Sequence, residues 1–124
     1  MSEQDIHKIC EKYNIKNYII NQDGSIDVEG DVFISNKNLD KLPLKFNYVS
    51  GVFVCSYNKL TSLEGSPKEV GIKLYCTGNP LTTLNGFNLP YDKLVCSLFT
   101  EDEMDILIKK HRRNRFIKHI VGDQ

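Results

Sequence analysis

A repeat of 21 residues in the middle of the chain is the feature that most limits its possible folds. The stretch VFVCSYNKLTSLEGSPKEVG, residues 52–71, is followed by LYCTGNPLTTLNG, residues 74–86, with similar residues at equivalent places. The matching pairs are Phe53 and Leu74, Cys55 and Cys76, Asn58 and Asn79, Leu60 and Leu81, and Leu63 and Leu84. A constant period of this length indicates stacked copies of one small structural unit.

The period extends in both directions from this central pair. The apolar positions of an earlier copy are Val32, Ile34, Leu39 and Leu42. In that copy Lys37 stands in the place of the asparagine. On the other side, Leu74 and Cys76 are followed 20 residues later by Leu94 and Cys96, where the pattern ends. We therefore expect three repeats and one further strand.

The spacing within a repeat has a simple physical interpretation. It matches the template L-x-L-x-x-N-x-L, which is the leucine-rich-repeat pattern. Alternate side chains of a short strand face the same side, so we expect Phe53 and Cys55 to point into the core. Asn58 follows where the chain leaves the strand, and its amide can bridge open backbone groups of its own repeat and the next. Leu60 and Leu63 then fill the core from the return segment.

The N-terminal residues have the pattern of a cap. Ser2 to Asp5 predicts the start of a helix. Apolar residues follow at helical spacing, namely Ile6, Ile9, Cys10 and Tyr13. The runs at 18–20 and 26–28 flank the turn residues Asn21-Gln22-Asp23-Gly24, which predicts a hairpin. We expect this helix and hairpin to cover the first repeat.

The C-terminal residues predict a single helix. Thr100 and Glu103 form a T-x-x-E capping box, so we expect a helix from Glu101 to Ile120. Its acidic start and basic end both suit the helix dipole. We expect Met104, Leu107 and Ile108 to pack on the last repeat. A second apolar group consists of Phe116, Ile117 and Ile120.

These segments predict one domain of the α/β class. A chain of 124 residues is long enough for a single domain. We expect a short leucine-rich-repeat solenoid with a parallel sheet on one face, since one repeat cannot bury its own apolar side. The N-terminal helix-hairpin cap would span 1–29, the repeats 30–98, and the C-terminal helix 99–124.

The chain also resembles a known group of proteins. The stretch DGSIDVEGDVFISNKNLDKLPLKF and the two SYNKLTSLEGSPKEVG-like repeats resemble the small leucine-rich-repeat proteins of tailed bacteriophages and related prokaryotic elements. The resemblance covers roughly residues 13–96. It implies a right-handed solenoid and a protein-binding module rather than an enzyme. It further implies an adaptor or inhibitor of a host protein, such as a defence or regulatory factor, in the host cytoplasm.

The outward-facing strand positions provide a candidate binding face. The residue between the two core positions is apolar or aromatic in all four strands, namely Phe33, Val54, Tyr75 and Val95. Contiguous apolar patches on a sheet mark interaction sites. The candidate protein-binding residues are therefore Phe33, Val54, Tyr75, Val95, Val52, Lys73 and Tyr57. The alternatives are that the hairpin or the C-terminal helix covers this row, or that a second copy of the chain does so in a structural homo-oligomer.

A second candidate surface lies on the C-terminal helix. Its second half is rich in basic residues, namely Lys109, Lys110, Arg112, Arg113, Arg115 and Lys118. Such clusters can contact nucleic-acid phosphates or an acidic protein, although the simplest interpretation is a solvated helix face.

Nothing in the sequence indicates catalysis, a metal or a cofactor. The histidines His7, His111 and His119 lie outside the repeats, and no phosphate-binding loop, H-E-x-x-H or paired cysteine motif is present. We interpret Cys55, Cys76 and Cys96 as small core residues. Sixteen basic and sixteen acidic residues balance, so the overall charge favours no partner. The polar start MSEQDIHKIC lacks a secretory apolar core, and no long apolar run predicts a membrane span. We expect a cytoplasmic protein.

Overall fold

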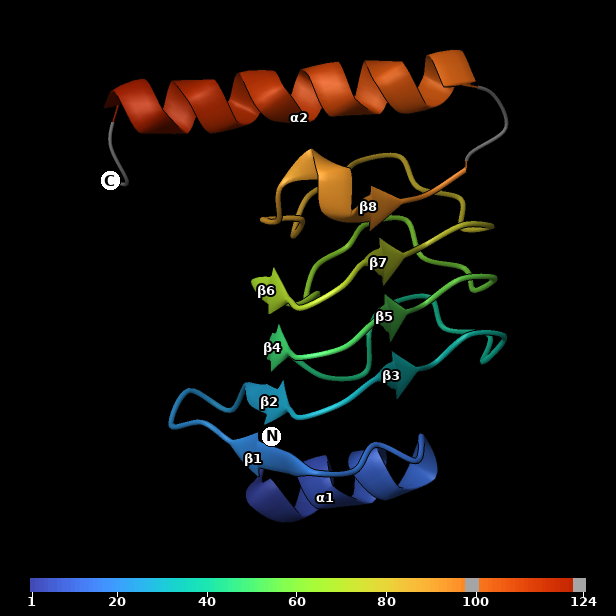
Figure 1. The fold of residues 1–124 in the computed structure, drawn as a ribbon, viewed down its shortest axis with the longest axis vertical. Helices are drawn as coiled ribbons and strands as arrows, with labels where there is room; N and C mark the ends of the chain where they lie inside the picture. The colour runs from blue at the N-terminus through green and yellow to red at the C-terminus, as the bar shows by residue number, and fades with distance from the viewer. Residues whose placement is uncertain (98–100, 122–124) are drawn as a thin grey trace.

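The computed structural model describes residues 1–97 and 101–121, and the side chains of residues 101 and 118–121 fall outside that description. The fold is α/β, with two helices and two small, mainly parallel sheets (Figure 1). One sheet has the strand order β1 (Tyr18–Ile20), β2 (Ile26–Val28), β4 (Phe46–Val49) and β6 (Glu69–Val70). The other has the order β3 (Val32–Phe33), β5 (Phe53–Val54), β7 (Leu74–Tyr75) and β8 (Leu94–Val95). Helices α1 (Glu3–Lys12) and α2 (Glu101–Val121) lie at opposite ends of the stacked strands, and a short 3-10 turn, η1 (Tyr91–Lys93), precedes β8.

The N-terminal helix and hairpin form as expected. The Ser2 side chain accepts a hydrogen bond from the Asp5 backbone N–H, and the Asp5 carboxylate accepts one from the Ser2 N–H, so α1 begins with a capping box. Ile6 and Cys10 form its buried face. Strands β1 and β2 pair antiparallel around a turn in which Gly24 has a φ of 86°. This hairpin covers the first repeat at the end opposite α2 (Figure 1).

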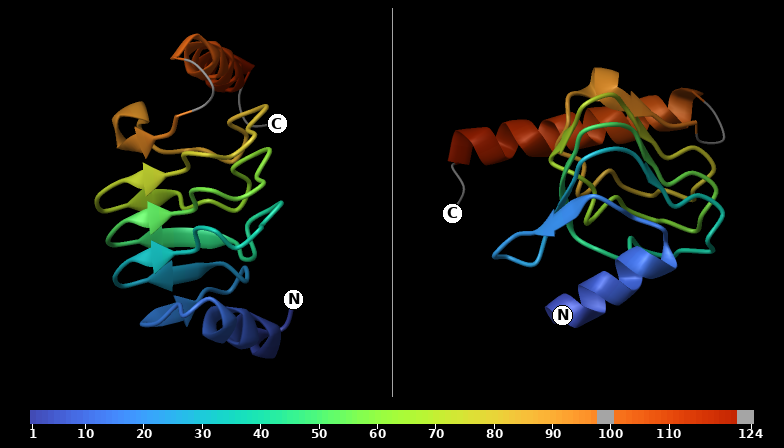
Figure 2. Two further views of the ribbon diagram at one scale, coloured as in Figure 1. Left: turned by 90° about the vertical axis from the view of Figure 1, so that its right-hand side faces the viewer. Right: turned by 60° about the horizontal axis from the view of Figure 1, so that its bottom comes forward.

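The second sheet confirms the register of the repeats. We number the repeats as first (32–52), second (53–73) and third (74–93). Strands β3, β5, β7 and β8 pair in parallel with equivalent residues adjacent. The paired residues are Val32, Phe53, Leu74 and Leu94 in one row and Phe33, Val54, Tyr75 and Val95 in the next. Sequence repeats therefore lie one above the other (Figure 2).

We expected a parallel sheet on one face only, and this expectation was incomplete. Each repeat also contributes a short strand before a corner, and β2 pairs in parallel with β4, and β4 with β6. At one corner a Cβ on Gly71 would lie 1.8 Å from the Ser50 carbonyl oxygen, so only glycine allows the two backbones to approach. The sequence concealed these strands because they are very short and contain polar residues such as Asn47 and Glu69.

The core is a continuous column inside the stacked repeats. The apolar strand positions of every repeat are buried, as are the leucines of the return segments. Phe46 and Phe53 meet edge to face, with ring centroids 4.8 Å apart. The largest fully buried side chains include Phe46, Phe53, Phe87, Ile26, Ile34, Leu60, Leu63, Leu74 and Leu84. The sequence period identified the core positions of all three repeats correctly.

The two repeat asparagines connect neighbouring repeats through the backbone. The Asn58 carbonyl oxygen accepts hydrogen bonds from the Lys37 N–H at 2.9 Å and the Leu39 N–H at 3.1 Å. Its amide nitrogen donates to the carbonyl oxygens of Ile34 and Cys55, at 2.9 and 3.0 Å. Asn58 therefore bridges its own repeat and the preceding one, not the following one as we expected. Asn79 repeats this arrangement one repeat later.

Helix α2 begins and ends close to where we expected and lies across the end of the third repeat (Figure 2). Leu107 and Ile108 pack against the core, and Met104 is half-buried. Thr100 of the expected capping box and the side chain of Ile120 lie outside the described residues. Phe116 and Ile117 are exposed, so these two residues do not pack on the repeats.

Candidate protein-binding site

The outward row of the second sheet contains the strongest candidate contacts. Phe33 is 62% exposed, whereas Val54, Tyr75 and Val95 are half-buried. The four residues are neighbours in one register row, because their strands pair directly. Adjacent strands lie about 4.8 Å apart, so the row extends over on the order of 15 Å. This gives a narrow apolar ridge with its most exposed member at the first repeat.

Tyr57 adds an aromatic ring beside this row. Its backbone has a φ of 56°, in the left-handed region that follows each strand, and Asn36 and Gly78 occupy the same position in the neighbouring repeats. A Cβ on Gly78 would lie 2.5 Å from the Tyr57 ring, so glycine there makes room for the tyrosine. The ring is nevertheless 60% exposed. Tyr57 and Phe33 are thus two exposed aromatic residues on the same side of the stacked repeats.

The remaining two candidates lie at the rim of the row. The Val52 N–H donates to the Asp31 carboxylate at 2.8 Å, which holds the corner between the sheets. The Lys73 ammonium donates to the Asp92 carbonyl oxygen of the next repeat. Both residues are half-buried. Their contacts are therefore structural, and Phe33 and Tyr57 are better placed to touch a partner.

Neither helix covers this face. Helix α1 and the hairpin lie at one end of the stack and α2 at the other, while the strands of the second sheet face outward between them (Figure 2). Among the described residues, the structure therefore does not support intramolecular cover of the row by the hairpin or by α2. A second copy of the chain remains an alternative occupant.

The basic cluster of α2 is divided between two roles. The Arg115 guanidinium donates to the carbonyl oxygens of Phe87 and Leu89, at 2.7 and 3.1 Å. It also lies 4.7 Å from the ring centroid of Tyr91. This residue fastens the helix to the third repeat rather than presenting its charge to a partner. The exposed basic residues are Lys109, Lys110, Arg112 and Arg113, whereas the Lys118 side chain is outside the described residues.

Sequence patterns did not indicate the aromatic and histidine contacts under α2. His111 is buried, and its Nδ1 lies 2.7 Å from the Tyr91 hydroxyl. The Arg112 guanidinium stacks over the same tyrosine, 5.0 Å from the ring centroid. Tyr91 therefore joins three helix residues to η1. A pattern search assigns such residues no common role, because they are distant in sequence and belong to no repeat.

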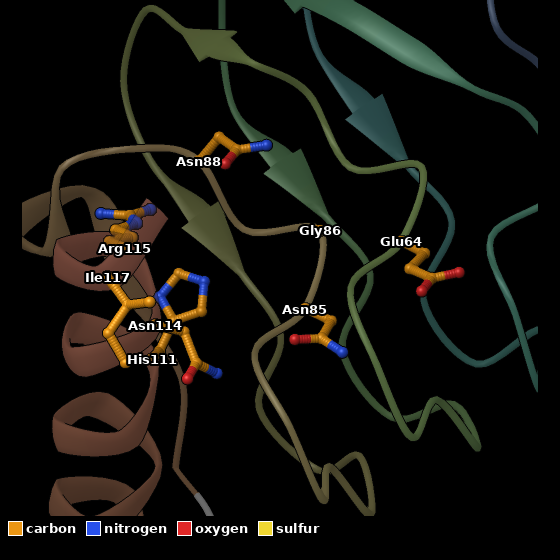
Figure 3. A pocket seen from close by; sticks show the side chains of 8 residues that line it. All are labelled: Glu64, Asn85, Gly86, Asn88, His111, Asn114, Arg115 and Ile117. Carbon is orange, nitrogen blue, oxygen red and sulfur yellow. The ribbon is translucent and has the colours of Figure 1, made fainter. Parts of the chain in front are cut away.

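A polar hollow of about 570 Å³ opens between α2 and the return segments. Figure 3 shows that its lining comes from both sides, and the lining residues are Glu64, Asn85, Gly86, Asn88, His111, Asn114, Arg115 and Ile117. Pockets that hold small molecules are lined mainly by apolar and aromatic side chains. This hollow is bordered instead by amides, a carboxylate and cationic or imidazole groups, which does not indicate a small apolar ligand.

The remaining chemistry-bearing residues do not gather into a metal centre. Within residues 1–97 and 101–121, no group of three or more His, Cys, Asp or Glu is arranged to hold a metal ion. His7 lies on α1, with its Nδ1 2.5 Å from the Tyr18 hydroxyl, far along the chain from His111. The side chain of His119 is outside the described residues. Cys55 and Cys76 are fully buried, as core residues, and Cys96 is half-buried.

Comparisons with known proteins give no relative for this chain. No family model matches it, and no curated protein and no solved structure shows significant similarity. Within the described part of the chain, no helix is both long enough and apolar enough to span a membrane.

Proposed function

We propose that this chain is a short leucine-rich-repeat solenoid that binds another protein and is not an enzyme. The 21-residue register of the second sheet supports the repeat assignment, because equivalent residues are direct neighbours. The bridging contacts of Asn58 and Asn79 support it as well, since each joins two repeats. Proteins of this type use a row of exposed side chains on stacked strands as their binding surface.

The observation that carries the proposal is the uncovered aromatic and apolar row on the second sheet. Phe33 and Tyr57 are both more than half exposed, although aromatic side chains of this size gain considerable free energy from burial. Aromatic residues often supply most of the binding energy in protein interfaces. The proposed contact residues are therefore Phe33, Tyr57 and Tyr75, with Val54 and Val95 completing the row.

The resemblance to small bacteriophage proteins suggests the kind of partner. On that basis the proposed role is an adaptor or inhibitor of a host protein, acting in the host cytoplasm without a cofactor. The sequence likeness to those phage proteins is the whole support for this part of the proposal.

An affinity pull-down from bacterial lysate tests the binding face. The wild-type protein is compared with a Phe33→Asp/Tyr57→Asp variant, whose two changes are at exposed positions and should leave the core intact. The matched control is Ile19→Asp, because Ile19 is also about as exposed, at 64%, but belongs to the other sheet. We expect a protein that is captured by wild type and by the control and is lost with the double variant. Capture that is identical in all three would contradict the proposal, and recovery of the chain itself would indicate a homo-oligomer.

The exposed part of the α2 cluster supports a second candidate function, which is contact with nucleic acid or an acidic protein. Lys109, Lys110 and Arg113 are exposed, and neutralising them leaves Arg115 and Arg112 in their contacts with the third repeat. The test is binding of a DNA or RNA duplex at increasing salt. A Lys109→Gln/Lys110→Gln/Arg113→Gln variant should lose affinity and show a smaller salt dependence. Absence of salt-sensitive binding by the wild type would remove this candidate.

A further inference from the structure

The three repeat cysteines form a row inside the second sheet. Cys55, Cys76 and Cys96 each follow a strand of that sheet by one residue, and their strands are direct neighbours. The Cys55 thiol donates to the Tyr75 carbonyl oxygen at 3.4 Å. The Cys96 thiol donates to the Cys76 carbonyl oxygen at 3.3 Å. The side chains therefore stack in the same direction along the row, and all three are free thiols.

Cys76 and Cys96 have the backbone spacing that a disulfide requires. The Cys76 N–H donates to the Val95 carbonyl oxygen at 2.9 Å, so the pairing of β7 and β8 continues at these residues. Neighbouring strands lie about 4.8 Å apart. Disulfides connect residues whose Cα atoms are about 4.4–6.8 Å apart. A bond between the two sulfur atoms is therefore compatible with the existing stack.

The two neighbouring pairs in the row differ in how an oxidant can reach them. Cys55 and Cys76 are both fully buried, with 0% exposure. Cys96 is half-buried, because it follows β8, the last strand of its sheet. Cys10, the fourth cysteine, is buried under α1 at the other end of the molecule. An oxidant from solvent therefore meets Cys96 first, and the adjacent thiol is that of Cys76.

The electrostatic surroundings assign the two thiols different roles. A hydrogen bond from the Cys76 thiol lowers the pKa of Cys96. The same bond, together with burial, raises the pKa of Cys76. Burial raises the pKa of Cys55 to about 12. Thiolate character and access together determine which cysteine reacts with peroxide, and both favour Cys96.

We propose that Cys96 and Cys76 are a peroxide-oxidisable pair, in which Cys96 is the reacting thiol and Cys76 the resolving thiol. In the first step the Cys96 thiolate attacks one oxygen of a hydroperoxide and breaks the O–O bond. Sulfur loses two electrons and becomes sulfenic acid, and the other peroxide oxygen leaves as water after taking a proton. In the second step the Cys76 sulfur attacks Cys96 Sγ. The S–S bond forms, the S–O bond breaks, and hydroxide leaves with the thiol proton as water. Two thiols and one hydroperoxide thus give one disulfide and water, or water and an alcohol.

The bond would connect the third repeat to the last strand before α2. Because Cys96 is half-buried, a small thiol reductant can reach the bond from that side and restore both thiols. The proposal concerns the end of the stack and does not depend on whether the outward face of the sheet binds a partner.

Peptide mapping of the native protein after exposure to hydrogen peroxide tests this inference. The four cysteines lie on separate tryptic peptides, residues 9–12, 46–59, 74–93 and 94–109, so each possible pair gives a different linked product. Remaining thiols are alkylated in denaturant before digestion. We expect the 74–93 and 94–109 peptides to be linked, and the link to disappear after reduction.

Three variants identify the roles of the two thiols. Cys96→Ser should abolish the link, and Cys76→Ser should leave Cys96 to proceed to sulfinic acid. The matched control is Cys55→Ser, which removes the third thiol of the same row and should leave the link unchanged. A link through Cys55, a link between two chains, or sulfinic acid at Cys96 in the wild type without any link would each overturn the proposal. The wild-type map decides the question even where a variant does not fold.

Discussion

Asn58 and Asn79 show how a single residue type can hold two repeats together. Each buried amide satisfies backbone groups that leave the strand and cannot reach a ladder partner. In the first repeat the equivalent position is Lys37, whose side chain is exposed. The difference follows from position in the stack, because the preceding neighbour of the first repeat is the hairpin and not another repeat. The asparagine is therefore required only where a repeat lies on a repeat.

This arrangement predicts a large difference between equivalent substitutions. Asn58→Ala leaves the Lys37 and Leu39 N–H groups and the Ile34 carbonyl oxygen without their partner. We expect it to lower the free energy of unfolding by about 3 kcal/mol. Lys37→Ala is the control at the equivalent position, and it should change the free energy by less than about 0.5 kcal/mol. Urea unfolding of both variants checks this, and equal midpoints would show that the asparagine contacts contribute little.

At the scale of elements, α2 is attached by a contact type that its sequence does not indicate. Leu107 and Ile108 give the helix a small apolar face. The other attachment comes from Arg115, which caps two carbonyl oxygens of the third repeat and stacks on Phe87 and Tyr91. A guanidinium suits this place because it donates several hydrogen bonds and also stacks on aromatic rings.

Removing this attachment should loosen α2 while the repeats stay folded. In Arg115→Ala the helix loses both hydrogen bonds and the two ring contacts, which together are worth about 2 kcal/mol. Amide hydrogen exchange across α2 should therefore become at least about tenfold faster, with little change in the strands. Arg113→Ala is the control, because Arg113 is an exposed basic residue on the same helix. Equal exchange in the two variants would mean that Leu107 and Ile108 alone hold the helix.

At the scale of the whole molecule, each repeat contacts mainly its neighbours. The strand pairs join only adjacent members of each sheet, and the return segments are joined in the same way, as by the Leu63 N–H and the Asn85 carbonyl oxygen at 2.9 Å. Leu42, Leu63 and Leu84 occupy the same position in successive repeats and are all buried. Stability in such a stack should depend on each repeat and on its nearest-neighbour interfaces.

Double-mutant cycles can measure this dependence. Leu42→Val, Leu63→Val and Leu84→Val should each lower the free energy of unfolding by about 1 kcal/mol, since each truncates a buried side chain. Leu63→Val with Leu84→Val should show a coupling of about 0.5 kcal/mol or more, because these positions are in adjacent repeats. Leu42→Val with Leu84→Val should be additive within about 0.3 kcal/mol, because one repeat separates them. Equal coupling in both cycles would show that the stack responds as one rigid unit.

Local patterns were sufficient to predict much of the molecule. The period of 21 residues located the strands of the second sheet, their register and the buried residues of each repeat. The capping pattern at Ser2 located α1, and the turn residues before Ser25 located the hairpin. The same register also identified the row that contains Phe33. These features are repetitive or local, so the spacing of residues along the chain is enough to specify them.

Other features were decided only by the tertiary structure. The sheet that contains β4 and β6 arises because glycine corners bring repeats into contact, and its strands are too short to show a pattern of their own. Whether the Phe33 row was open depended on where α1 and α2 pack, which periodicity does not specify. The division of the basic cluster likewise depended on Arg115 meeting Phe87, a residue from another part of the chain. The sequence by itself determined what repeats with the chain, whereas contacts between segments that share no period required the folded structure.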